Sequence, residues 1–140
     1  MAPPVRFPYT PAGMTEASLM PRLSLTLSHE QRSVETVGLL DTGAAVNVLP
    51  YPVGVAFGAD WDQQSTVISL AGSLGRVEAR ALVLLASHPQ PTLDGPIRLV
   101  FAWTRAEDAP VIFRQTSFFM EFNVCFYRSQ AAIDVHLREG

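Results

Sequence analysis

The sequence contains a single cysteine, Cys125, among 140 residues. One cysteine excludes an intrachain disulfide and any metal site built from cysteine and histidine clusters, so we expect a reducing compartment. Basic residues are also few: 10 lysines and arginines stand against 13 aspartates and glutamates, and they are scattered singly along the chain. A nucleic-acid partner or an anionic membrane surface would need a basic patch, and the sequence therefore predicts neither.

Long apolar runs are missing as well. No 18 apolar residues follow one another, and residues 1–6 lack the basic start and the apolar segment of a secretory signal. We therefore expect a cytoplasmic protein that does not enter a membrane.

The composition favours one domain of mainly β structure. Apolar residues make up 48% of the chain and charged residues 16%, while 11 prolines and 9 glycines indicate many short elements joined by turns. A chain of this length can bury about two-thirds of the surface that its unfolded form exposes. Four prolines within residues 1–20 predict an irregular N-terminal arm, and we expect the domain itself to span residues 21–140.

Period-2 alternation predicts the strands. Leu23, Leu25 and Leu27 alternate with polar residues, which is typical of a half-buried strand. Further strands are expected at residues 34–40, 45–49, 66–70, 76–85, 97–103, 124–127 and 132–137, with a helical turn at 53–57 and one short C-terminal helix at 115–122.

An acid lies where two of these apolar runs meet. Residues 34–40 lead into Asp41-Thr42-Gly43-Ala44, and a second apolar run, interrupted only by Asn47, follows. Gly43 allows a tight backbone reversal between the two runs. Because Asp and Gly are common turn formers, the tripeptide alone fits an ordinary hairpin as well as a catalytic turn.

The order of segments resembles the retropepsins, the single-lobe aspartic proteases. The resemblance spans residues 23–126 and is sharpest over Gly38-Leu39-Leu40-Asp41-Thr42-Gly43-Ala44-Ala45-Val46-Asn47-Val48-Leu49-Pro50. Three segments are also similar in sequence to cyanobacterial retropepsin-like proteins: Phe7-Pro8-Tyr9-Thr10, Asn47-Val48-Leu49-Pro50-Tyr51 and Phe118-Phe119-Met120-Glu121-Phe122-Asn123-Val124. The resemblance implies an all-β fold with one short C-terminal helix, a closed β-barrel of a single acid-protease lobe.

The resemblance also implies a mechanism that one chain cannot complete. Aspartic protease chemistry uses two carboxylates, and this chain has one Asp-Thr-Gly, so two copies must pair as a homodimer around Asp41 and Asp41′. The substrate would be an extended peptide, cleaved by an activated water, with no metal and no other cofactor. By resemblance, Thr42 links the two loops across the dimer and Gly43 lets backbone amides approach the carboxylates.

Ala44, the predicted hairpin tip and Phe113 give three further predictions. A hydroxyl at position 44 would stabilise the ionised pair of carboxylates, so Ala44 predicts a rate optimum at weakly acidic to near-neutral pH. Ala71, Gly72, Ser73, Leu74 and Gly75 form the tip of a predicted hairpin and are the candidate flap over the substrate. Phe113 stands where retropepsins usually have a glycine, and we expect its ring to crowd the backbone near the catalytic turn or to reshape the site.

Other residues favour structural roles. His29, His88 and His136 lie far apart without a serine nucleophile motif, so a catalytic triad is not expected. We expect Trp61 and Trp103 in the core or a pocket wall, and Cys125 packed in a strand. Two alternatives to an active protease stay open: a retropepsin-like dimerisation or peptide-binding module without turnover, favoured by Phe113, and an unrelated β-barrel.

Overall fold

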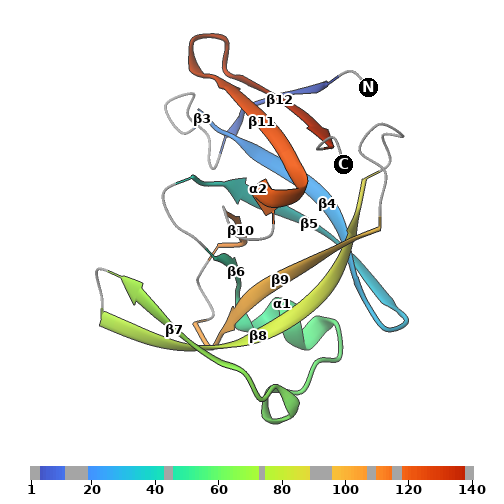
Figure 1. Cartoon of the computed structure of the whole chain (residues 1–140), viewed down its shortest axis with the longest axis vertical. Helices are drawn as coiled ribbons and strands as arrows, with labels where there is room; N and C mark the ends of the chain where they lie inside the picture. Colours follow the sequence, from blue (N-terminus) through green and yellow to red (C-terminus); the bar gives the residue numbers. More distant parts are fainter. Residues whose placement is uncertain are drawn as a thin grey trace.

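The computed structural model describes residues 4–11, 19–42, 46–72, 75–88, 96–106, 110–114 and 118–137, with the backbone alone at 69–72 and 75–77. One sheet dominates the fold, and its strands are β4 Arg22–His29, β5 Arg32–Leu40, β6 Asn47–Leu49, β7 Val67–Gly72, β8 Gly75–Ser87, β9 Ile97–Thr104 and β10 Ile112–Phe113. Their order in the sheet is β4-β5-β10-β6-β9-β8-β7, and β4 also pairs with β8. This additional pairing closes six of the strands into a barrel and leaves β7 outside it, paired with β8 (Figure 1). The closed β-barrel predicted from the sequence is therefore confirmed.

The barrel strands follow the predicted runs closely. The pairing of β4 with β5 is antiparallel, whereas β10 joins β5 in parallel and β6 joins β9 in parallel. The short strand β10 is an addition to the predicted set.

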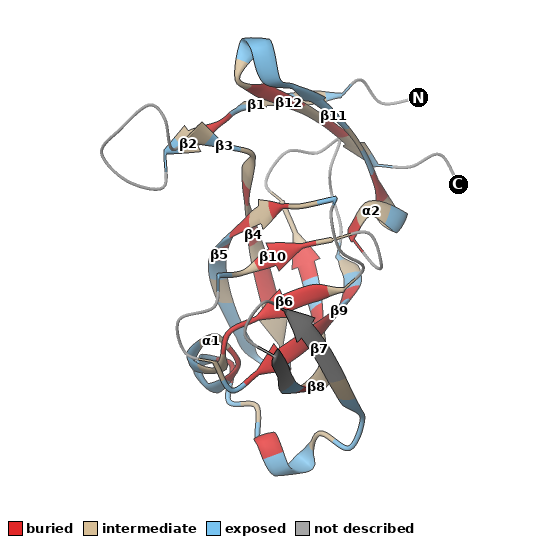
Figure 2. Ribbon diagram, turned by 90° about the vertical axis from the view of Figure 1, so that its left-hand side faces the viewer, coloured by how far each residue is buried: buried red, intermediate tan, exposed pale blue. Residues whose placement is uncertain are grey.

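Alternation in β4 explains why the barrel closes around an apolar interior. Leu23, Leu25 and Leu27 are all buried, and the residues between them are only partly covered. The interior is completed by large side chains from β9 and β10, including Phe101, Trp103 and Phe113, each fully buried. Figure 2 shows the buried residues gathered in the barrel strands.

A second, three-stranded sheet lies beside the barrel. It has the order β1-β12-β11, with β1 at Val5–Pro8, β11 at Phe122–Tyr127 and β12 at Ala132–Leu137. We call it the terminal sheet, because it joins the N-terminal and C-terminal strands of the described chain (Figure 1). The predicted C-terminal hairpin is confirmed.

The N-terminal segment differs from the irregular arm expected over residues 1–20. Residues 5–8 pair with β12, and β2 at Thr10–Pro11 pairs with β3 at Leu19–Met20. Val5 and Phe7 pack against the hydrophobic core, so even this short alternation suffices for a strand once β12 provides an edge. Residues 12–18 lie outside the described residues.

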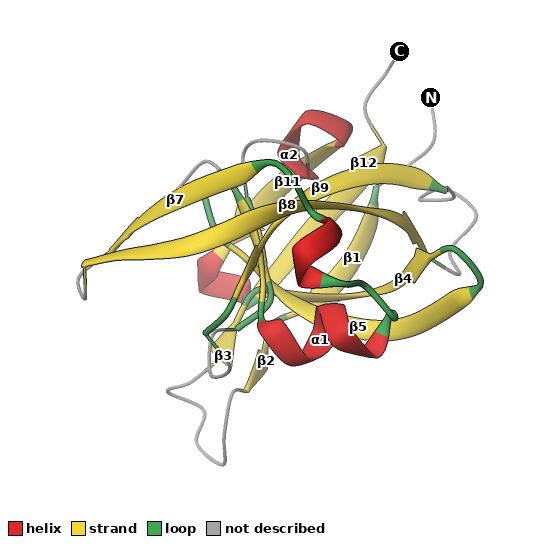
Figure 3. Ribbon diagram, turned by 90° about the horizontal axis from the view of Figure 1, so that it is seen from below, coloured by secondary structure: helices red, strands yellow, loops and turns green. Residues whose placement is uncertain are grey.

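Helical structure is limited to short elements. Helix α1 spans Tyr51–Ala56, the 3₁₀ helix η2 spans Trp61–Gln63, α2 spans Phe118–Glu121 and a second 3₁₀ helix, η4, spans Arg128–Gln130. Figure 3 shows α1 and α2 on different sides of the barrel. The predicted C-terminal helix is thus present at 118–121. Among the described residues, none of the helices has the length and apolar character needed to span a membrane.

Candidate active site

Asp41 follows immediately after the last residue of β5, and the backbone around it is held from both sides. The Asp41 N–H donates to the Phe113 carbonyl at 3.0 Å, and the Leu40 N–H donates to the Pro21 carbonyl at 2.9 Å. Strand β10 pairs Phe113 with Leu40 in parallel register. The end of β5 is therefore a central strand position, and a side chain placed there has little freedom to shift.

The Asp41 side chain is accessible yet lies close to a positive charge. It is 36% exposed, and its Oδ2 lies 3.6 Å from Nη2 of Arg114, whose side chain is 20% exposed. The Arg114 Nε is buried, and no acceptor for it exists among the described residues. One chain thus places a partly covered guanidinium beside the acid, a contact that no sequence pattern predicts.

Asn47 fixes the backbone on the other side of β10. Its buried side chain accepts a hydrogen bond from the Arg114 N–H at 2.6 Å and donates to the Val100 carbonyl at 3.1 Å. One amide therefore connects β6, β9 and the residue that carries the guanidinium. Asn47 was the one polar residue within an apolar run, and a buried amide in such a position needs partners of this kind.

Phe113 points into the core and lies against β5. Its ring is fully buried in the core, where it stacks on Phe118 at 5.0 Å and meets Phe101 edge-on at 6.2 Å. The ring lies over Gly38 of β5, and its backbone carbonyl accepts the Asp41 N–H. The space for the ring thus comes from Gly38, three residues before the acid.

The hairpin that contains the candidate flap extends beyond the barrel. Strands β7 and β8 pair down to Gly72 and Gly75, and the pairing of β8 with β9 begins only at Ala79. In Figure 1, β5 ends toward the side of the molecule from which this hairpin projects. The backbone at Ala71, Gly72 and Gly75 is in the paired strands, whereas Ser73 and Leu74 lie outside the described residues.

The root of the hairpin is anchored by Arg80. Its guanidinium donates to the Trp61 carbonyl at 2.7 Å and lies 4.8 Å from the centre of the Trp61 ring. The Trp61 ring in turn packs edge-on against Trp103 at 5.2 Å. Both tryptophans are buried, as predicted, and they tie the hairpin to η2 and β9.

The remaining sequence-predicted residues are placed as follows. Thr42 is exposed next to Asp41, while Gly43 and Ala44 lie outside the described residues, so the expectations for them stay predictions. Cys125 is exposed on β11 rather than packed, because alternation in this strand of the terminal sheet turns it to solvent. His88 contacts the Phe7 ring edge-on at 5.3 Å, and partial burial lowers the pKa of its imidazole.

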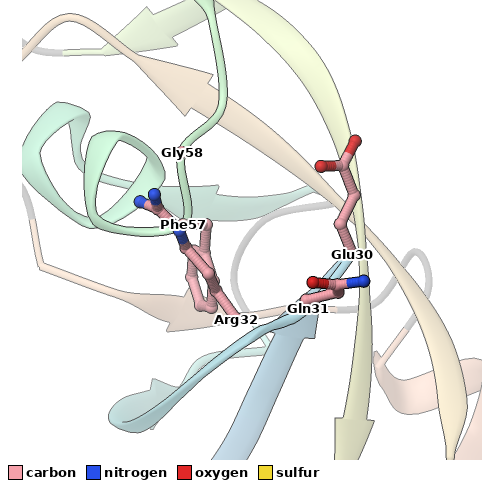
Figure 4. A pocket seen from close by; sticks show the side chains of 5 residues that line it. All are labelled: Glu30, Gln31, Arg32, Phe57 and Gly58. Atoms are coloured by element: carbon pink, nitrogen blue, oxygen red, sulfur yellow. The ribbon is translucent and has the colours of Figure 1, made fainter.

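A hollow of about 430 Å³ lies away from the acid. Glu30, Gln31 and Arg32 line it from the β4–β5 turn, opposite Phe57 and Gly58 at the end of α1 (Figure 4). The β4–β5 turn leads into the start of β5, whereas Asp41 follows the end of β5. The hollow is therefore separate from the candidate active site.

Comparison with known proteins supports the fold. No family model matches the sequence, and no curated protein matches it. Among solved structures, a retropepsin-like aspartic protease from Rickettsia conorii is similar, with a TM-score of 0.63 and 10% sequence identity over 93% of this chain and 98% of that chain. The expectation of a cyanobacterial group is not tested by these comparisons. At this identity the likeness shows the fold, and the chain has the closed-barrel fold of a retropepsin-like aspartic protease.

Proposed function

We propose that this protein is a homodimeric aspartic endopeptidase in which Asp41 and the Asp41 of a second copy form the catalytic pair. The observation that carries the proposal is the position of Asp41: accessible, at the end of a central strand, in a barrel shared with a retropepsin-like aspartic protease. We propose an extended peptide as substrate and retain the cytoplasm as the expected compartment.

The chemistry follows from two carboxylates that share one proton. Like charges a few ångströms apart disfavour double ionisation, so one carboxylate acts as base and the other as acid. The base takes a proton from a water molecule, and the water oxygen bonds to the peptide carbonyl carbon. At the same time the acid protonates the carbonyl oxygen. The C–N bond then breaks as the leaving nitrogen receives a proton, and the water's atoms are divided between the two products.

Features of the described chain support a second copy as the partner. One chain offers one acid of this kind, and α2 and the terminal sheet carry several exposed apolar side chains that are available for subunit contact. These side chains are Met120, Phe126, Tyr127 and Leu137, between 36% and 61% exposed. We further propose that Thr42, Gly43 and Ala44 support the catalytic loop and that residues 71–75 form the flap.

A peptide-library digest across pH tests the proposal. The native chain is expected to cleave, with an optimum at weakly acidic to near-neutral pH, and Asp41→Asn is expected to abolish cleavage because it removes the base. Sedimentation of both proteins gives the oligomeric state and shows that the substitution leaves it intact. Cleavage that survives the Asp41→Asn change contradicts the mechanism.

A second candidate function is a retropepsin-like dimerisation or peptide-binding module without turnover. The Arg114–Asp41 ion pair favours it, because the carboxylate already faces a guanidinium of its own chain. Arg114→Gln in the same digest separates the two candidates. If native protein is inactive and Arg114→Gln cleaves, the ion pair suppresses turnover; if neither cleaves but both bind peptides, the module is the better description.

A further inference from the structure

Gly38 and Phe113 fit together as one contact. A methyl group built on Gly38 would overlap the Phe113 ring, at 2.7 Å from both Cδ2 and Cζ and nearer still to Cε2. The ring is fully buried between Phe101 and Phe118, so it has no open space into which it can turn. A side chain at position 38 and a phenyl ring at position 113 therefore exclude each other in this geometry.

This contact lies on the strand that leads to the acid. Gly38 precedes Asp41 by three residues on β5, and Phe113 pairs with Leu40 across the sheet. The carbonyl of Phe113 accepts the Asp41 N–H at 3.0 Å. The residue whose ring rests on the strand thus also holds the backbone of the acid.

The ring also connects this strand with the terminal elements. Phe113 stacks on Phe118 of α2, and Phe118 stacks on Phe122 of β11 at 4.8 Å. A displaced Phe113 would therefore meet resistance from α2 on one side and from β5 on the other. A change of volume at position 38 is transmitted to the β5–β10 pairing rather than absorbed by the ring.

We propose that Phe113 is a positioning residue for Asp41 and that Gly38 is the matched small residue that lets the ring reach this place. The catalytic consequence rests on the proposed protease function. The placement of the Asp41 backbone is independent of that function, and it can be measured even in a protein that cleaves no peptide.

Amide hydrogen exchange provides that measurement, with a reference one residue away. The Asp41 amide bonds to Phe113 on β10, whereas the Leu40 amide bonds to Pro21 on the opposite side of β5. A positioning role predicts that perturbing the contact speeds exchange at Asp41 more than at Leu40. A residue that merely fills the core would change the two protections together, through global unfolding.

The experiment uses Gly38→Ala, Phe113→Leu and the double variant. Gly38→Ala is expected to lower Asp41 protection relative to Leu40 about fivefold or more, and Phe113→Leu in the Gly38→Ala background is expected to restore most of it, since leucine leaves room for the methyl group. If Gly38→Ala does not fold, recovery of a folded protein by the double variant is itself the expected rescue. Failure of the double variant to recover folding or protection overturns the proposal.

Gly54→Ala is the matched control. A methyl group at Gly54 would overlap the Trp103 ring, but Gly54 is in α1, which lies away from the end of β5 that leads to Asp41 (Figure 1). It is expected to lower stability while leaving the ratio of Asp41 to Leu40 protection unchanged. An equal change of that ratio in Gly54→Ala and Gly38→Ala contradicts a specific role of Phe113.

Kinetics separate the failure of this proposal from the failure of the function. If the native chain cleaves peptides, Gly38→Ala is expected to lower kcat about tenfold or more with little change in KM, because the acid is misplaced. If the native chain does not cleave, the protease proposal fails and the exchange ratio still decides the positioning proposal. Native cleavage with unchanged kcat and unchanged exchange ratio in Gly38→Ala overturns only the positioning role.

Discussion

Among the residues that the structure describes, two glycines lie against an aromatic ring, and the two contacts stabilise different parts of the molecule. Gly38 is in β5, the barrel strand that leads to Asp41, and it lies against the Phe113 ring. Gly54 is in helix α1, and it lies against the Trp103 ring. In both places a single methyl group would overlap the ring. The steric relation is the same, yet only one contact lies next to the candidate catalytic residue.

The rings differ in what else holds them. The Trp103 Nε1–H donates to the Tyr51 carbonyl at 3.1 Å, and the indole stacks on the Tyr51 ring at 5.6 Å. Phe113 has no polar atom on its ring, and its tie to the site is its own backbone carbonyl. Trp103 therefore secures α1 through its side chain, whereas Phe113 secures the acid through its main chain.

The largest expected effect comes from Trp103→Ala. Loss of a fully buried indole is expected to lower the free energy of unfolding by about 3–5 kcal/mol, measured by urea denaturation. The ratio of Asp41 to Leu40 amide protection should not change, because the Trp103 ring packs on Tyr51 and Trp61. Trp103→Phe, which keeps most of the ring and loses the hydrogen bond, should cost less; a changed ratio in Trp103→Ala would show that the two contacts are not independent.

Asn47→Ala is expected to have an intermediate effect on stability. The loss concerns the backbone near Asp41 rather than the contact between Trp103 and α1. Without the Asn47 side chain the Arg114 N–H loses its 2.6 Å acceptor, which costs about 1–3 kcal/mol for a buried donor. Denaturant unfolding measures the loss. Asn123→Ala, an exposed amide whose side chain lies 3.3 Å from His136, is the control and should change stability by less than about 0.5 kcal/mol. Equal effects at both positions would remove Asn47 from the support of the site.

The smallest effect is expected at an exposed ion pair of the terminal sheet, between Arg6 and Asp134. Arg6 Nε lies 2.6 Å from Asp134 Oδ1, and this hydrogen bond holds the pKa of the Asp134 carboxyl below its ordinary value of 3.8. The ion pair therefore stabilises the fold above that value, and the contribution is lost as the pH falls through the lowered pKa. Its exposure limits the effect.

Thermal unfolding between pH 7 and pH 2 measures this contribution. Asp134→Asn is expected to lower Tm slightly at pH 7 and to match the native protein at the acid end, where the native carboxyl is also protonated. Asp62→Asn, an exposed carboxylate in η2, is the control. A difference between native and Asp134→Asn that grows toward acid pH would have the wrong sign.

The sequence predicted the strands because alternation is local. Leu23, Leu25 and Leu27 are buried as their spacing indicates. Strand β1 was missed because its alternation covers only four residues among prolines, and it forms only where β12 offers an edge. The resemblance to retropepsins predicts the closed barrel, and the Asp41-Thr42-Gly43 turn indicates Asp41 as the candidate catalytic residue.

The contacts around Asp41 could not be predicted in the same way. Phe113 was noticed as a large residue in place of a glycine, but its relief at Gly38 depends on the parallel pairing of β5 with β10, which joins distant segments. The Arg114–Asp41 ion pair depends on the same pairing. Of the residues around the acid, Asn47 is the one that the local sequence indicates, because it is a polar residue in an apolar run.

The central claim is that activity needs one Asp41 from each of two chains, and mixing tests it most directly. Native chain is equilibrated with increasing amounts of Asp41→Asn chain at constant total concentration, and the peptide-cleavage rate is measured. At equal amounts of the two chains, random pairing leaves roughly a quarter of the dimers fully native, so the rate should fall to about that share of the all-native rate. A rate that falls only in proportion to the native chain, to about half, would contradict a catalytic pair shared between subunits.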